Sequence, residues 1–159
     1  MQKNEKQFTN FKIHTQYSIC EGAVKIDDLA SYCRDNKIKA VGICDSFNMC
    51  GALEFAEKLS KIGSQPLIGT QINFKFDDNV SKLPIFATTE EGYKNLVSIS
   101  SKSFIESPPD QDPQCDLNEL FKNHKDLIVL SGGLNDFFGN FFTNNKLEII
   151  EGLFKKFKD

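Results

Sequence analysis

Polar side chains able to take part in chemistry are gathered in the first half of the chain, where short apolar runs end. The first such place is residues 11–22, which read as a short strand followed by a polar turn. Because side chains alternate across a strand, Lys12, His14 and Gln16 are expected on one face. A base or a charged group could act from that face.

Nucleophilic catalysis has little support in this sequence. Ser18 and Ser46 have His14 as their only plausible base in the first half of the chain, and no Gly-x-Ser-x-Gly elbow is present. A Cys–His pair that used Cys44 would need an exposed thiol, whereas Cys44 lies in an apolar run that we expect to be buried.

Short apolar runs alternate with helical patterns along the chain. Ile26, Leu29, Ala30 and Cys33 have the spacing of one helix face and predict a helix over residues 24–36. Further helices are predicted over residues 51–62, 88–105, 116–121 and 147–157, and strands over 39–44, 66–74, 83–87 and 127–130. Residues 77–79 read as a turn and 107–114 as a surface loop.

This alternation predicts an α/β fold with mainly parallel strands and outer helices, either open or closed into a barrel. Ligands in such folds gather at the carboxyl ends of the strands. The rule places on one rim Lys12, His14, Glu21, Asp45, Ser46, Gln71 and Ser131. Five strands are too few for the common closed barrel, which has eight.

Composition narrows the class of protein. The 159 residues are 40% hydrophobic with a net charge of -3, which fits one globular domain and argues against a large basic nucleic-acid footprint. No apolar run approaches membrane-spanning length and the start lacks a signal-peptide core, so we expect a cytoplasmic protein that makes no membrane contact. The five cysteines show no C-x-x-C spacing and are expected to be free thiols.

Four segments resemble, in order and spacing, motifs of one family. They are IHTQYSICEG at residues 13–22, ICDSFNMCGALEF at 43–55, PLIG at 66–69 and EGYKNLV at 91–97. Together they are similar to the N-terminal PHP domain (polymerase and histidinol phosphatase) of the bacterial replicative DNA polymerase III alpha subunit. The likeness runs from about residue 11 to residue 135.

The resemblance implies a distorted seven-stranded α/β barrel of which residues 1–159 form the N-terminal part, without the polymerase core. It implies DNA replication, by template-directed DNA synthesis, as the role of the longer chain, a nucleotidyltransferase. The partners implied are the rest of the alpha chain and the proofreading exonuclease subunit, with DNA reached only through the full-length polymerase. The fragment alone is expected to have no activity.

Metal-competent members of the family hold a cluster of divalent ions with His, Asp and Glu side chains, and in some polymerases that cluster carries a proofreading exonuclease. The corresponding positions here are Lys12, His14, Glu21, Asp45, Ser46, Gln71 and Lys82. The family has histidine at the positions of Lys12, Ser46 and Lys82 and an acidic residue at that of Gln71. A protonated lysine has no lone pair and a glutamine oxygen is a weak neutral donor.

Only His14, Glu21 and Asp45 therefore keep usable ligand chemistry, and we expect a vestigial site without a catalytic residue, metal or cofactor in this segment. We also expect the Lys12 ammonium to stand beside Glu21 and Asp45 in place of the lost ion. The favoured role is thus a non-catalytic scaffold that packs on the polymerase core. An active metal-dependent PHP exonuclease or phosphoesterase is the alternative, and a free-standing α/β phosphatase is a weaker one.

Some of the residues with possible functional roles also have simple structural explanations. Asp45 could simply form a turn and cap the following helix. His124 is expected in a solvated loop, and the Gly132-Gly133 pair lacks the Lys-Ser/Thr of a phosphate-binding loop. The basic and aromatic residues 154–158 have the spacing of a core-facing helix.

Overall fold

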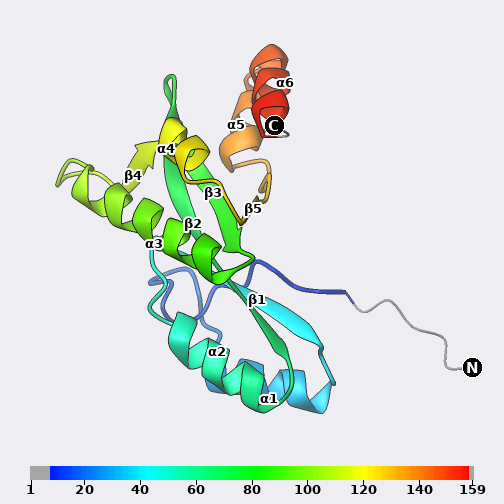
Figure 1. The fold of residues 1–159 in the computed structure, drawn as a ribbon. Coiled ribbons are helices and arrows are strands. Elements are labelled where there is room, and N and C mark those ends of the chain that lie inside the picture. The colour runs from blue at the N-terminus through cyan, green and yellow to red at the C-terminus, as the bar shows by residue number, and fades with distance from the viewer. Residues whose placement is uncertain (1–7, 158–159) are drawn as a thin grey trace, which may run out of the picture.

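The computed structural model describes residues 8–157 and shows an open α/β fold (Figure 1). The helices are α1 (Ile26–Asp35), α2 (Ala52–Lys61), α3 (Glu90–Ile105), α4 (Leu117–Lys122), α5 (Phe137–Thr143) and α6 (Leu147–Lys156). The strands are β1 (Ala40–Ser46), β2 (Gln65–Phe76), β3 (Asn79–Ala87), β4 (Gln114–Asp116) and β5 (Leu127–Val129). All five predicted helices and the four strands predicted after residue 38 are therefore present, while α5 and β4 were not predicted.

The sheet is mixed, which corrects the expected mainly parallel arrangement. Strand β2 pairs in parallel with β1 and β4, whereas β3 runs antiparallel to both β2 and β5. The reason is local: only two residues, Asp77 and Asp78, join β2 to β3, and a connection that short allows only a hairpin. Asp77 takes the positive φ of 52° that such a turn requires. The parallel expectation needed a helix between these strands.

The predicted first strand also differs, because residues 10–13 lie along β1 without forming a regular ladder. The Gly42 amide donates to the Asn10 carbonyl at 2.7 Å, and the Cys44 amide to the Ile13 carbonyl at 2.8 Å. Between them the Ile13 amide donates to the Phe11 carbonyl at 3.2 Å, which closes a three-residue turn around Lys12. This turn interrupts the strand and breaks the expected alternation of its side chains.

Two hydrophobic clusters hold the elements together. One joins α1 and α2 to β1, and its members include Ile26, Leu29, Cys33 and Phe55. The larger joins β2 and β3 to helices α3–α6. No helix within residues 8–157 is long and apolar enough to cross a membrane.

Close approach of the N-terminal segment to β1 generates a test at Gly42. A Cβ atom there would lie 2.5 Å from the Phe11 carbonyl oxygen, so the segment would have to move. We expect Gly42→Ala to lower the free energy of unfolding by about 1–3 kcal/mol in urea denaturation. Gly152→Ala is the matched control: it meets no atom within 4 Å and should stabilise α6 by about 0.5–1 kcal/mol. Equal behaviour of the two variants would contradict the packing described.

Candidate functional site

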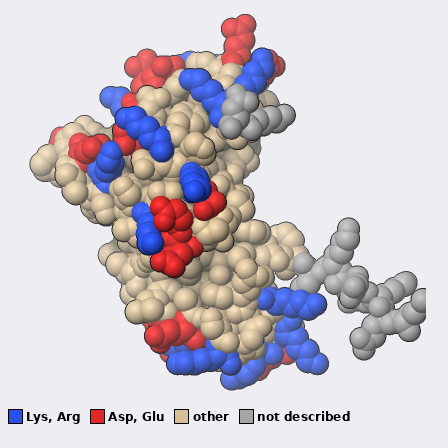
Figure 2. Space-filling view, in the orientation of Figure 1, with Lys and Arg blue, Asp and Glu red and all other residues tan. Residues whose placement is uncertain are grey.

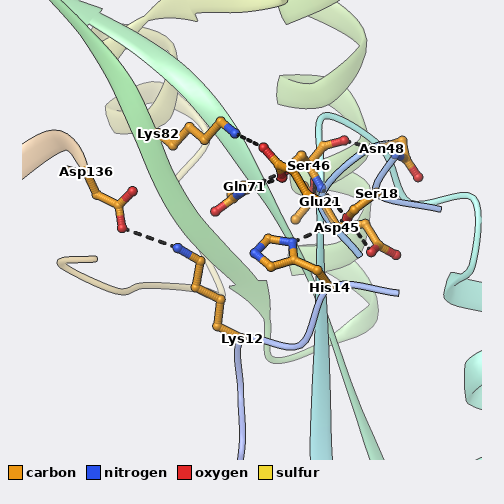
Figure 3. A network of polar contacts seen from close by, with 11 residues as sticks. Lys12, His14, Ser18, Glu21, Asp45, Ser46, Asn48, Gln71, Lys82 and Asp136 are labelled. Atoms are coloured by element: carbon orange, nitrogen blue, oxygen red, sulfur yellow. Dashed lines mark hydrogen bonds and ion pairs between the residues drawn. The ribbon is translucent and has the colours of Figure 1, made fainter. Parts of the chain in front are cut away.

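Asp45 is the most buried charged side chain of the site and lies near the carboxyl end of β1, 1% exposed. Its Oδ1 accepts from the Thr15 amide at 2.6 Å and from the Ser18 hydroxyl at 2.6 Å, and its Oδ2 accepts from the Thr15 hydroxyl at 2.7 Å. Both Thr15 and Ser18 are fully buried. Both carboxylate oxygens are thus occupied by protein donors, so Asp45 does more than form a turn (Figure 3).

Ser18 fixes the ring of His14. The single hydroxyl hydrogen of Ser18 is donated to Asp45, and its oxygen accepts from the Ser46 amide at 3.1 Å. The 3.3 Å contact with His14 Nδ1 therefore needs a hydrogen on that nitrogen, which leaves the lone pair on Nε2. Burial lowers the pKa of the His14 imidazole from its usual 6.5, and the nearby Lys12 and Lys82 lower it further against the opposite effect of Glu21 and Asp45. His14 is thus neutral at pH 7.

Glu21 is held by an ion pair with Lys82, whose Nζ lies 2.6 Å from Glu21 Oε1. The Ser46 hydroxyl donates to Glu21 Oε2, and the Gln71 amide nitrogen donates to Ser46 Oγ at 2.6 Å. The Lys82 and Ser46 hydrogen bonds lower the pKa of the Glu21 carboxyl. Lys82 also lies over the ring of Phe47, with Nζ 5.1 Å from the centroid.

Lys12 has a different partner from the one expected. Its Nζ lies 3.3 Å from Asp136 Oδ2, and the same carboxylate oxygen accepts from the Gly133 amide at 2.7 Å. The ammonium that contacts Glu21 is that of Lys82 instead (Figure 3). Sequence reasoning missed Asp136 because it missed α5, which this residue precedes. An Asp before an apolar segment was the available signal of a helix start.

Of the seven positions that the family resemblance predicted, the structure brings six together and links them by direct contacts. His14, Ser18 and Asp45 form one group, and Glu21, Ser46, Gln71 and Lys82 form another, joined through the Ser46 backbone amide. Lys12 lies at the edge of this network, paired with Asp136. Ser131 lines an apolar groove beside β5.

The residues present do not fit a divalent-metal cluster. Within residues 8–157, no three His, Cys, Asp or Glu side chains are grouped so that they could hold a metal ion. The Asp45 oxygens are engaged by hydrogen-bond donors, and one Glu21 oxygen faces an ammonium. Among the fully buried side-chain oxygen and nitrogen atoms of the described residues, Gln71 Oε1 has no hydrogen-bond partner.

Comparison with known proteins gives the family. The model of the PHP domain matches residues 10–159. The chain belongs to the PHP domain family. Within it, the chain matches the N-terminal region of DNA polymerase III alpha subunits, as the sequence motifs had predicted.

Three curated relatives, each a DNA polymerase III subunit alpha, illustrate the match. The Helicobacter pylori protein is 38% identical over 112 residues, which is 65% of this chain and 9% of the relative. The Buchnera aphidicola protein is 30% identical over 92% of this chain and 13% of the relative, and the Aquifex aeolicus protein 31% over 97% and 15%. The chain therefore spans only 9–15% of the length of these relatives.

The similar solved structures share a lower sequence identity with this chain than the curated relatives do. A crystal structure of a putative metal-dependent phosphoesterase from Bifidobacterium adolescentis is 21% identical, with a TM-score of 0.43 over 61% of this chain and 35% of that chain. An amidohydrolase from Chromobacterium violaceum with bound sulfate and no metal is 14% identical, with a TM-score of 0.45 over 59% and 34%.

The ion pair between Lys82 and Glu21 yields a pH-dependent prediction. Because the pKa of Glu21 is lowered from 4.5 in the folded state, the pair stabilises the fold above pH 4.5, and that stabilisation is lost as pH falls through the folded-state pKa. In NMR titrations of the carboxyl carbon, Lys82→Gln should raise the pKa of Glu21, while the exposed control Lys61→Gln should leave it unchanged. An unchanged Glu21 pKa in Lys82→Gln would show that the ion pair does not form.

Proposed function

We propose that residues 1–159 form the N-terminal part of the PHP domain of a cytoplasmic bacterial replicative DNA polymerase, and that this segment is structural rather than catalytic. In this proposal the longer chain carries out template-directed DNA synthesis, and the segment packs against the polymerase core and offers a docking surface for the proofreading subunit. The match to DNA polymerase III alpha subunits over most of the chain supports the assignment.

A single observation carries the non-catalytic role: Lys82 pairs with Glu21 where the family places a metal-binding histidine. An ammonium beside a carboxylate supplies the positive charge that a bound cation would otherwise supply, without needing a coordination shell. At the second acidic position, three hydrogen bonds from neutral donors satisfy the Asp45 carboxylate. The polar network is thereby held together by the protein's own groups.

The middle of the face shown in Figure 2 carries charges of both signs. Acidic and basic side chains lie next to one another there, while further basic side chains gather toward the lower edge. Phosphate binding depends on clustered lysines and arginines. In this proposal, DNA contact is made by the longer polymerase chain.

One observation favours the alternative, an active metal-dependent exonuclease or phosphoesterase. The buried Gln71 Oε1 lacks a partner, and a buried unsatisfied acceptor is uncommon and costs about 1–3 kcal/mol. A ligand at this place would satisfy it. The lone pair of His14 Nε2 is the other acceptor that the network leaves available.

Metal and nuclease measurements on the same chain separate the two roles. We expect 5′-labelled single-stranded DNA to stay intact with Mn²⁺ or Zn²⁺, and the thermal midpoint to be the same with either ion or EDTA. A variant that combines Lys12→His, Ser46→His, Gln71→Glu and Lys82→His restores the family's ligand types at these four positions and should gain metal-dependent stabilisation. It serves as the positive control for metal uptake.

Hydrolysis of the DNA by the unmodified chain would contradict a structural role. Metal-dependent hydrolysis by the unmodified chain, abolished by both Asp45→Asn and His14→Ala, would establish the exonuclease. Hydrolysis that survives both substitutions would instead reveal a contaminating nuclease.

A further inference from the structure

An ion pair connects the N-terminal segment to the loop that precedes α5. Lys12 Nζ lies 3.3 Å from Asp136 Oδ2, although the two residues are 124 positions apart in the chain (Figure 3). Their side chains are 33% and 16% exposed, respectively, so water screens the pair only in part. Partial shielding strengthens the attraction between two charges relative to a fully exposed pair. The pair therefore ties two distant parts of the chain together.

Asp136 organises residues 131–136, which lie between β5 and α5. Its Oδ2 accepts from the Gly133 amide at 2.7 Å, and a Cβ atom on Gly132 would lie 2.5 Å from the Asp136 side chain. The Asp136 carbonyl accepts from the Asn140 amide at 3.0 Å and so begins α5, which buries three phenylalanines in the larger hydrophobic cluster. A shift of the Asp136 side chain would therefore move both the loop and the start of α5.

Lys12 belongs to the segment that holds Asp45. The turn around Lys12 is closed by the Ile13 amide and the Phe11 carbonyl, and Ile13 packs against the smaller hydrophobic cluster. Thr15 follows in the same segment, and its amide and hydroxyl donate to Asp45 at 2.6 and 2.7 Å. Because only two residues separate Lys12 from Thr15, the position of Lys12 constrains the position of these donors.

We propose that the Lys12–Asp136 pair is a conformational link between the polar network around Asp45 and the start of α5, so that loosening either end loosens the other. Such a coupling is reciprocal, because one free energy describes the effect of each end on the other. The two ends pack in different hydrophobic clusters, which would open more independently without the pair. The link depends on no metal, substrate or partner, so it holds whether the segment is structural or catalytic.

Amide hydrogen exchange of the 159-residue chain, followed by NMR, tests this link in both directions. Asp136→Asn keeps a side-chain oxygen that can accept from the Gly133 amide but removes the charge that Lys12 binds. We expect it to raise the exchange rate of the distant Thr15 amide about fivefold relative to the amides of α2, which is the low end for coupled sites. Lys12→Gln should raise the relative exchange rates of the Gly133 and Asn140 amides by a similar factor.

A double variant and two exposed controls complete the experiment. Lys12→Gln combined with Asp136→Asn should accelerate the exchange of these three amides no more than the more effective single variant, because both substitutions remove the same contact. The controls Asp112→Asn and Lys61→Gln change exposed charges in the loop before β4 and at the end of α2. They should leave the three exchange rates unchanged.

Three outcomes would overturn the link. The first is an unchanged relative exchange rate of the Thr15 amide in Asp136→Asn. The second is unchanged relative rates of the Gly133 and Asn140 amides in Lys12→Gln. The third is an additive effect in the double variant, which would show that the two side chains act separately.

Discussion

The hydrogen bonds that surround Asp45 are the constraint on which the site depends. A buried carboxylate is costly unless donors replace the water that it loses, and here Thr15 and Ser18 supply three. Both residues belong to the N-terminal segment, whereas Asp45 belongs to β1. Satisfying one charge therefore also fixes the segment that carries His14 and Glu21 against the sheet.

In the proposal that this is a vestigial metal site, the same constraint explains how the site keeps its shape without the family's ligands. Bound ions in such sites organise carboxylates by neutralising them. In this chain the hydroxyls around Asp45 and the ammonium of Lys82 organise the acids instead. Gln71 is the exception within the described residues, because its buried Oε1 has no hydrogen-bond partner.

Local patterns in the sequence predicted much of the fold but not the strand directions. Helix α1 buries Ile26, Leu29 and Cys33, as the helical spacing indicated. Helix α5 escaped prediction because its sequence, FFGNFFT, has phenylalanines on several sides and a glycine inside, which hides any single apolar stripe. The hairpin between β2 and β3 was missed because the turn was recognised without its consequence for strand direction.

The same hairpin explains why the sequence predicted the residues of the site but not the contacts between them. In its register Gln71 lies opposite Pro84 and Asn73 opposite Lys82, so Lys82 shares a face with Gln71 and reaches Glu21. A parallel sheet gave no such relation, and Lys12, which stands at the position of a family ligand, was expected beside Glu21 instead. Resemblance to the PHP family supplied the candidate positions, while the contacts between them depended on long-range register.

Hydrogen exchange at the Thr15 amide tests most directly whether the protein's own groups hold this site together. This amide donates to Asp45 at 2.6 Å, and the account predicts that in EDTA it exchanges as slowly as the amides of β1, with no change when Zn²⁺ is added. Rapid exchange in EDTA that becomes slow only with Zn²⁺ would contradict the account, because the segment would then need a metal to fold onto the sheet.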